Sequence, residues 1–196
     1  SFLNFCENKT YLFAKPNKGL QGIGAKKINL SEHSNIDKLY EELVDGDYVV
    51  EEFIEQHEAM AQFHPFSLNT FRITTIIKDN SIHILSAVIR MGNDKQVVDN
   101  YSAGGIVASV DINSGIISSA GVTQSAIDKF LFHPITGKQI IGFKIPLWDE
   151  IIELVQKMAI VNSDIGYVGW DIALSKKGPV LVEANFQGGF NLQQSP

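Results

Sequence analysis

An acid and an amide alternate near the end of the chain, in the stretch VLVEAN at residues 180–185. Side chains on a strand alternate between its two faces, so Glu183 and Asn185 share one face if this stretch is a strand. The preceding stretch YVGWDIAL, residues 167–174, is also strand-like, and the turn-forming residues SKKG separate the two. We therefore predict a hairpin here.

The loop of this hairpin decides which residues face each other. A three-residue loop at 176–178, with glycine in its third place, pairs Asp171 with Glu183 and Gly169 with Asn185. Opposed carboxylates repel unless a cation lies between them, and two carboxylates with an amide oxygen are typical ligands of a nucleotide-bound Mg²⁺. A solvated polar sheet face is the alternative, and a two-residue loop would put the acids on opposite faces. The other face is expected to be core: Val168, Trp170, Ile172 and Leu174 against Val180, Val182 and Ala184.

A glycine-rich segment follows Lys15 and is a candidate phosphate-binding loop. Gly19, Gly22 and Gly24 free the backbone to present N–H groups to an anion. The segment matches neither the P-loop pattern nor GxGxxG. A flexible hairpin tip without a ligand is the alternative interpretation.

Arg72 and Arg90 lie inside apolar stretches that we predict to be strands. An unpaired guanidinium is costly to bury, so each arginine needs an anion. Either a bound ligand or a structural salt bridge meets this need. The polar loop DNYSAGG at residues 99–105, which contains Asn100, suits either anion or substrate contact or a tight turn.

Composition excludes several classes of function. The 196 residues carry 16 basic and 22 acidic side chains, a net charge of −6, so we expect no nucleic-acid partner and no anionic membrane surface. No apolar stretch reaches the roughly 20 residues of a membrane span, and the single cysteine, Cys6, excludes an internal disulfide, which favours a cytoplasmic protein. The five histidines do not have the spacing of zinc ligands, and those before proline suit surface or structural positions. The G-x-S-x-G motif of a serine nucleophile does not occur.

The remaining patterns predict an α+β fold with mostly antiparallel strands. Apolar residues at helical spacing indicate amphipathic helices at 34–44 and 147–161. Trp148 and Trp170 fall on apolar faces and are expected in the core. Strand-like runs separated by turn residues lie at 9–16, 22–30, 47–54, 69–92 (turning at Asp79-Asn80-Ser81), 103–110 and 115–120.

The order of these elements resembles the ATP-grasp superfamily, in which FAKP with a glycine-rich hairpin, VVEEFIEQH, FRITTI, WDIAL and VLVEAN correspond to successive elements. HPFSLNTFRITTI, AVIRMGN, VVDNYSAGGI, HPITGK and YVGWDIAL are similar to its sugar-transfer-associated family, known from polysaccharide-biosynthesis gene neighbourhoods. The likeness spans residues 9–194. It implies two lobes of mostly antiparallel sheet with flanking helices and a nucleotide cleft between them. Residues 1–55 would be a partial first lobe, and residues 56–196 a second lobe with the metal site.

The resemblance implies roles for individual residues. Asp171, Glu183 and Asn185 match the family's ligands for Mg²⁺, for which Mn²⁺ is an alternative. Arg72 matches the arginine that helps hold the transferring phosphoryl group, and Asn69 just before it is expected to assist. Arg90 and Lys15 complete the expected catalytic group.

The same resemblance implies contacts with ATP. Lys15 would reach the phosphates, and the loop 17–24 would fold over the β- and γ-phosphates. Five further residues are expected to contact the adenine or the ribose, and one more lies in the polar loop. For the acids among them, the alternative is that they are ordinary solvated surface charges. Those contacts are Glu51, Glu52, Phe53 and Ile54 for adenine, Glu58 for the ribose hydroxyls, and Asn100 in the polar loop.

The implied activity is that of an ATP- and Mg²⁺-dependent carboxylate ligase. The γ-phosphoryl group moves to a small-molecule carboxylate, and an amine or similar nucleophile, with sugar-linked substrates as one option, attacks the acyl phosphate. This chemistry needs positioning and electrostatics, which agrees with a sequence that has no evident nucleophile. ATP-grasp enzymes normally have an N-terminal domain and an earlier lysine that this sequence lacks, so we expect a truncated chain or a reduced relative. Two alternatives follow: a non-catalytic nucleotide-binding or scaffold module of a polysaccharide assembly system, or a kinase-like phosphotransferase acting on a sugar hydroxyl.

Overall fold

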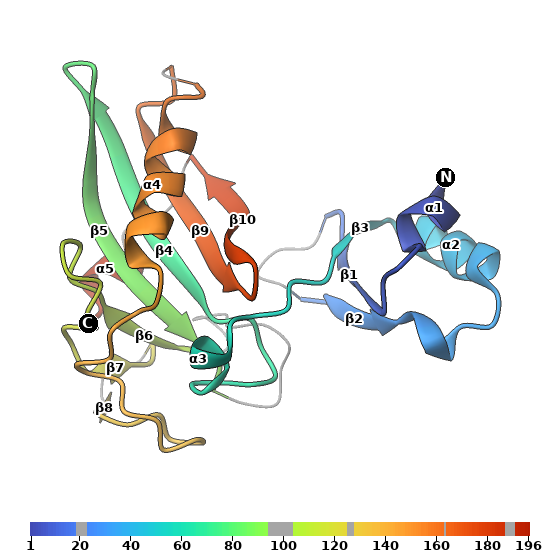
Figure 1. Cartoon of the computed structure of the whole chain (residues 1–196), viewed down its shortest axis with the longest axis horizontal. Coiled ribbons are helices and arrows are strands. Elements are labelled where there is room, and N and C mark those ends of the chain that lie inside the picture. The colour runs from blue at the N-terminus through green and yellow to red at the C-terminus, as the bar shows by residue number, and fades with distance from the viewer. Residues whose placement is uncertain (19–22, 94–103, 125–127, 163, 187–190) are drawn as a thin grey trace. The chain divides into compact units, whose positions relative to one another are not determined.

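The chain divides into two compact units, unit 1 at Ser1–Ile54 and unit 2 at Glu55–Pro196 (Figure 1). A computed structural model describes residues 1–18, 23–93, 104–124, 128–162, 164–186 and 191–196. Three residues predicted to bind ligand, Gly19, Gly22 and Asn100, lie outside these ranges. The boundary expected from the sequence followed residue 55.

Unit 1 contains a three-stranded antiparallel sheet, in which the hairpin and the strand predicted at 47–54 are joined, and the helix predicted at 34–44 is confirmed as α2. The strand order is β2-β1-β3, and α2 begins after Asn35, whose side chain accepts a hydrogen bond of 3.0 Å from the Lys38 backbone N–H. The short N-terminal helix α1 was not predicted. The elements are α1 (Phe2–Cys6), β1 (Tyr11–Pro16), β2 (Lys26–Asn29), the 3-10 turn η1 (Leu30–Glu32), α2 (Ile36–Asp45) and β3 (Tyr48–Glu52), around a core of Leu12, Ala14, Ile28, Leu39 and Leu43.

Unit 2 is built on a seven-stranded sheet whose neighbouring strands all pair antiparallel, in the order β10-β9-β4-β5-β6-β7-β8. The predicted strands at 69–92 and in the C-terminal hairpin are confirmed and form its centre. The strands are β4 (Thr70–Lys78), β5 (Ser81–Met91), β6 (Ile106–Ser109), β7 (Gly121–Val122), β8 (Lys129–Phe130), β9 (Tyr167–Ser175) and β10 (Gly178–Asn185); the helices are α3 (Glu58–Ala61), α4 (Trp148–Ala159) and α5 (Asn191–Gln194).

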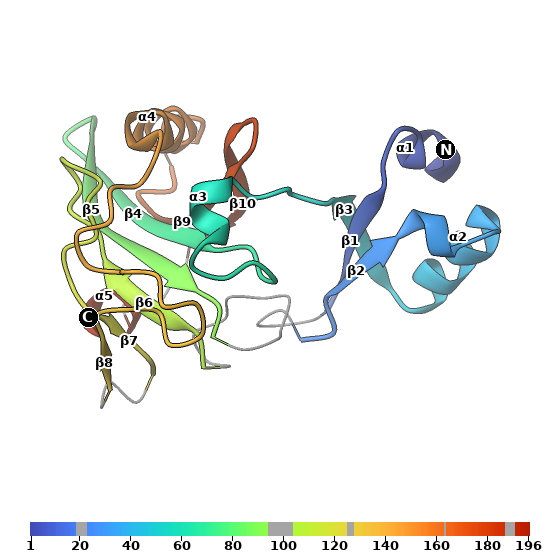
Figure 2. The ribbon, with the colours of Figure 1, turned by 60° about the horizontal axis from the view of Figure 1, so that its bottom comes forward.

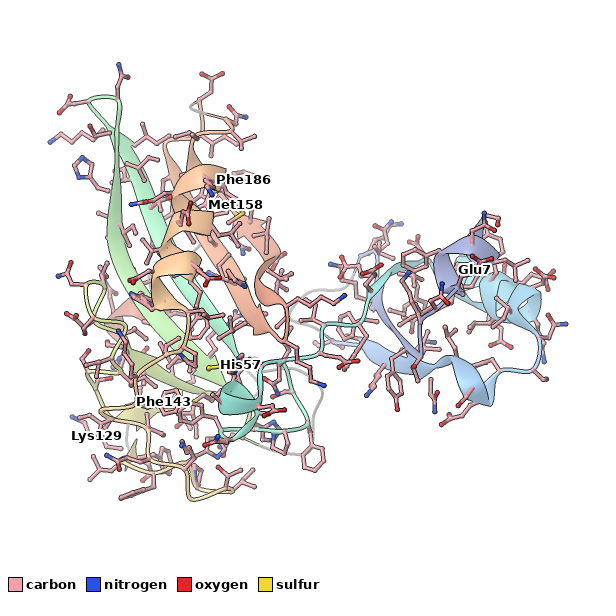
Figure 3. All side chains as sticks on the ribbon, viewed as in Figure 1. Glu7, His57, Lys129, Phe143, Met158 and Phe186 are labelled. Carbon is pink, nitrogen blue, oxygen red and sulfur yellow. The ribbon has the colours of Figure 1, made fainter. Side chains whose placement is uncertain are left out.

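Helices α4 and α5 lie on opposite faces of the sheet of unit 2 (Figure 2). Helix α4 buries Trp148, Ile151 and Val155 in the main core, which confirms the helix predicted at 147–161 and the core position of Trp148. Met158 lies near the C-terminal end of the same helix (Figure 3). On the other face, Leu192 of α5 packs against a small buried cluster on β5 and β6.

Local sequence explains the turns that define these strands. Asp79 and Asn80 take φ values of 52° and 56°, which a two-residue type I′ turn requires and which asparagine and aspartate tolerate. This confirms the predicted turn between β4 and β5. The predicted strand at 115–120 is wrong as a continuous element, because Ile116 and Ile117 make only isolated bridges to residues outside the strands.

None of the helices in the described ranges is long and apolar enough to cross a membrane.

Replacement of Gly115 by alanine should destabilise unit 2, because this residue has a φ of +64° and an added Cβ would lie 2.3 Å from Cγ of Trp148. Gly137→Ala is a matched control, since Gly137 has a φ of +69° but nothing within 4 Å of the added Cβ. We expect a loss of about 1–2 kcal/mol of unfolding free energy for Gly137→Ala from the backbone alone. Gly115→Ala should lose about 1–3 kcal/mol more from overpacking. Urea unfolding measures both, and equal losses would contradict the packing of Trp148.

Candidate functional site

The pairing of β9 with β10 places Asp171 opposite Glu183 and Gly169 opposite Asn185, as predicted. The predicted loop, however, is wrong. Ser175 pairs with Gly178, so the loop has two residues, and the Ser175 hydroxyl closes it by accepting from the Lys177 N–H at 3.1 Å and donating to the Gly178 carbonyl at 2.8 Å. A β-bulge then shifts the register between Leu181 and Glu183. This extra residue restores the pairing that the shorter loop would have lost.

The shorter loop also changes which β10 side chains face the core. Val180 pairs with Ala173 and so lies on the face of Asp171, which corrects the expected position of Val180. Val182 occupies the bulge. Ala184 lies opposite Trp170 as expected but is exposed, because β10 is the edge strand of the sheet. The expected core positions on β9 are confirmed: Val168, Trp170, Ile172 and Leu174.

A buried ion-pair cluster joins β4, β5 and β9 on this face of the sheet. Arg72 lies opposite Asp171, and its Nε and Nη2 donate to the two carboxylate oxygens, Nη2 at 2.9 Å from Oδ2. Nη2 of Arg90 lies 3.2 Å from the same Oδ2. Asp171 is 2% exposed and Arg72 is 8% exposed. The carboxylate of Asp171, which we had expected to bind a metal, thus supplies an anion to both arginines.

Gly169 gives Arg72 the space to reach Asp171. A Cβ at Gly169 would lie 3.1 Å from Cδ of Arg72 and 3.6 Å from its Nε, so the arginine side chain passes over this glycine. This role of Gly169 was not predicted from the sequence. A glycine inside an otherwise apolar strand, which often marks close approach of another group, was the available signal.

Glu183 and Asn185 supply oxygen atoms beside the cluster. Glu183 is exposed, and its side chain makes no hydrogen bond or ion pair with the described part of the chain. Nδ2 of Asn185 is buried without a partner there. These oxygens fit a hard cation such as Mg²⁺. Asp171 already accepts three N–H contacts, so it keeps roughly one of about four lone-pair sites for a metal. Within the described ranges, no three His, Cys, Asp or Glu side chains form a metal cluster.

Asn69, expected to assist catalysis, lies in a network of hydrogen bonds to the segment 56–64 and to Gly92. It is fully buried, and Nδ2 contacts Oε1 of Gln56 at 2.9 Å and the carbonyls of Met60 and His64 at 3.0 Å. Its Oδ1 accepts from the Gly92 N–H at 3.4 Å. Both polar atoms of this amide are thus used within the fold, and a role of Asn69 in catalysis stays a prediction.

The predicted nucleotide contacts of unit 1 form their own ion pairs. Nζ of Lys15 lies 2.5 Å from Glu51, and Glu52 pairs with Lys9 at 3.1 Å. The ring of Phe53 lies beside that of Tyr11, with 5.7 Å between their centroids. Gly24 has a φ of +81°, and an added Cβ would lie 2.9 Å from Cγ of Pro16. In unit 2, Glu58 is the exposed first residue of α3.

Two buried histidines form a second polar cluster in unit 2, next to Asn69. Nδ1 of His64 lies 2.7 Å from the Ser67 hydroxyl, and Nε2 of His133 lies 2.7 Å from the Gly92 carbonyl. Both histidines are 1% exposed. The histidines before proline were expected at surface or structural positions, and the structural alternative is confirmed. Burial lowers the pKa of His133, the Gly92 hydrogen bond opposes this shift, and the nearby His64 adds to it. We therefore expect His133 to become protonated at a lower pH in the folded chain than in the unfolded chain, because its pKa is lowered.

A family model described as "Sugar-transfer associated ATP-grasp" matches residues 25–195. The chain belongs to this family, and its antiparallel sheets with few helices are those of the α+β ATP-grasp fold. No curated protein matches the chain. Among solved structures, D-alanine–D-alanine ligase from Bacillus anthracis is similar with a TM-score of 0.47 and 15% identity; the match covers 100% of this chain and 49% of the ligase, so the chain spans about half the ligase's length.

Asp171→Asn should destabilise unit 2, because it removes the carboxylate that contacts the buried guanidinium group of Arg72 and the half-buried one of Arg90. Loss of one partner of a buried ion pair costs about 3–5 kcal/mol of unfolding free energy. Glu183→Gln on the facing position is the control, since this exposed side chain lacks a described partner and should change stability by less than about 0.5 kcal/mol. Equal effects in urea unfolding would show that the ion-pair cluster does not form.

The stability of the chain should fall as the pH drops below the ordinary histidine pKa of 6.5. The folded pKa of His133 is lowered, so the unfolded chain binds more protons in the window between the two pKa values, and stability decreases there as pH falls. His133→Gln, which keeps an N–H donor, should reduce this slope in unfolding measured between about pH 5.5 and 7.5. His83→Gln, at an exposed position on β5, should leave it unchanged. An unchanged slope in His133→Gln would refute the assignment.

Proposed function

We propose that this chain carries out ATP- and Mg²⁺-dependent activation of a carboxylate for attack by an amine or similar nucleophile, and that it serves cell-surface polysaccharide biosynthesis. Membership of the sugar-transfer-associated ATP-grasp family supports an ATP-dependent, ligase-type function. The link to polysaccharide rests on that family's description. We also propose that the two units correspond to the two ATP-grasp lobes.

One observation carries the proposal: fixed cations and metal-type oxygens share one face of the unit 2 sheet. Arg72, Asp171 and Glu183 form a single cross-strand row on β4, β9 and β10. Arg90 joins the row through Asp171, and Asn185 lies two residues beyond Glu183. Phosphoryl transfer depends on cations that are already oriented when charge develops on the transferring group. This row meets that requirement without any side chain acting as a covalent nucleophile.

In the proposed mechanism, Arg72 and Arg90 stabilise the negative charge of the phosphoryl group as it passes to the substrate carboxylate, and then that of the acyl phosphate. Asp171 keeps both guanidinium groups in place, so they need little reorganisation during the reaction. Glu183 and Asn185, with the remaining lone pair of Asp171, would hold Mg²⁺, which neutralises phosphate charge when bound. Lys15, Gly24, residues 51–54 and Glu58 stay proposed nucleotide contacts.

Calorimetric titration with a non-hydrolysable ATP analogue, with and without Mg²⁺, tests the proposal. Mg²⁺ should strengthen binding to the unmodified chain by about tenfold or more, and this gain should be largely lost in Glu183→Gln, because a carboxylate ligand is replaced by a neutral amide. Glu153→Gln, which removes an exposed carboxylate of α4 on the opposite sheet face, should behave like the unmodified chain.

Equal binding in all of these conditions would contradict the metal assignment. Assays of phosphate release and product with carboxylate, amine and sugar substrates then separate the remaining functions. ADP with an amide or ester supports the ligase, and a phosphosugar would identify a kinase-like enzyme. Mg²⁺-dependent binding without turnover would favour a nucleotide-binding module.

A further inference from the structure

Thr70 holds the second arginine of the cluster in a defined orientation. It is the first residue of β4, lies directly opposite Arg90 on β5, and is 3% exposed. Its hydroxyl oxygen lies 2.9 Å from Nε and 2.7 Å from Nη2 of Arg90. Two donors of one planar guanidinium group therefore converge on a single oxygen, which fixes the plane of the group as well as its position.

The two arginines of the cluster are oriented by different means. Asp171 binds Nε and Nη2 of Arg72, one to each carboxylate oxygen, which is the bidentate arrangement that orients a guanidinium group on its own. Arg90 meets the same carboxylate through Nη2 at 3.2 Å. The bonds from Nε and Nη2 to the Thr70 hydroxyl add a second fixed point, which sets the orientation of the guanidinium plane.

The side chain of Thr70 is itself rigid. A β-branched residue in a strand has few χ1 rotamers, and this one is buried between β5 and β9, where it also lies opposite Ala173. A rigid hydroxyl acceptor is thus present where the Arg90 guanidinium must be oriented. Valine has nearly the same shape but no acceptor, and serine keeps the acceptor without the branch.

We propose that Thr70 is a positioning residue that orients Arg90 toward the anionic oxygens of the transferring phosphoryl group. The proposal rests on the proposed function for the role of Arg90, but the orientation itself does not. It adds to the catalytic group a residue that contacts no substrate and acts through its neighbour.

A double-mutant cycle tests the role in binding. Mg²⁺-dependent affinity for a non-hydrolysable ATP analogue is measured for Thr70→Val, Thr70→Ser, Arg90→Lys and the Thr70→Val/Arg90→Lys double variant. Thr70→Val should weaken binding about tenfold, as expected for loss of a hydrogen bond to a charged group, and Thr70→Ser should stay within about twofold. In the Arg90→Lys background, Thr70→Val should have little further effect. Additive effects, or unchanged binding by Thr70→Val, would overturn the proposal.

A second measurement separates failure of this inference from failure of the proposed function. NMR of the arginine Nε–H groups, without nucleotide, should show faster proton exchange at Arg90 in Thr70→Val than in Thr70→Ser, with Arg72 as internal reference. Arg90→Lys identifies the signal by its loss. Arg90 exchange could be faster in Thr70→Val although neither the unmodified chain nor any variant binds the analogue. That result would support the orientation of Arg90 by Thr70 and contradict the proposed ATP-dependent function. Identical Arg90 exchange in the valine and serine variants would overturn the orientation.

Discussion

The carboxylate of Asp171 is the constraint on which this side of the sheet depends. Two guanidinium groups from neighbouring strands approach one buried carboxylate, and an unpaired charge at this depth would cost several kcal/mol. The cluster therefore requires β5, β4 and β9 to keep their present register, because a shift of one residue would move a charged side chain to the apolar core face. The same requirement fixes where Glu183 and Asn185 stand on the next strand.

Much of the candidate site could be predicted because it depends on alternation along strands. The period of two places Glu183 and Asn185 on one face whatever the partner strand does. Pairing of Asp171 with Glu183 was also predicted correctly, but from a wrong loop: the Ser175 hydroxyl favours a two-residue turn, and the bulge at Val182 compensates. Local sequence does not reveal a bulge in an edge strand, since few packing contacts distinguish the two registers there.

Contacts between distant segments could not be predicted. Arg72 and Asp171 are 99 residues apart in sequence, and the need of each arginine for an anion does not say which of the acids provides it. The contacts of Asn69, His64 and His133 likewise depend on backbone groups brought together by tertiary packing. The cluster thus gives Asp171 a role that the sequence did not indicate. It orients two cations in the fold, and any metal must share it with them.

The most direct test of this account is paramagnetic broadening of the arginine Nε–H signals by Mn²⁺ bound with a non-hydrolysable ATP analogue. Broadening falls steeply with distance, so it reports whether the cation lies beside the Asp171 cluster. The account predicts that the signals of Arg72 and Arg90 broaden strongly in the unmodified chain and much less in a chain whose Glu183 carboxylate is neutralised. Sharp signals from both arginines, the only two in the sequence, while backbone amide signals elsewhere in the chain broaden, would contradict it.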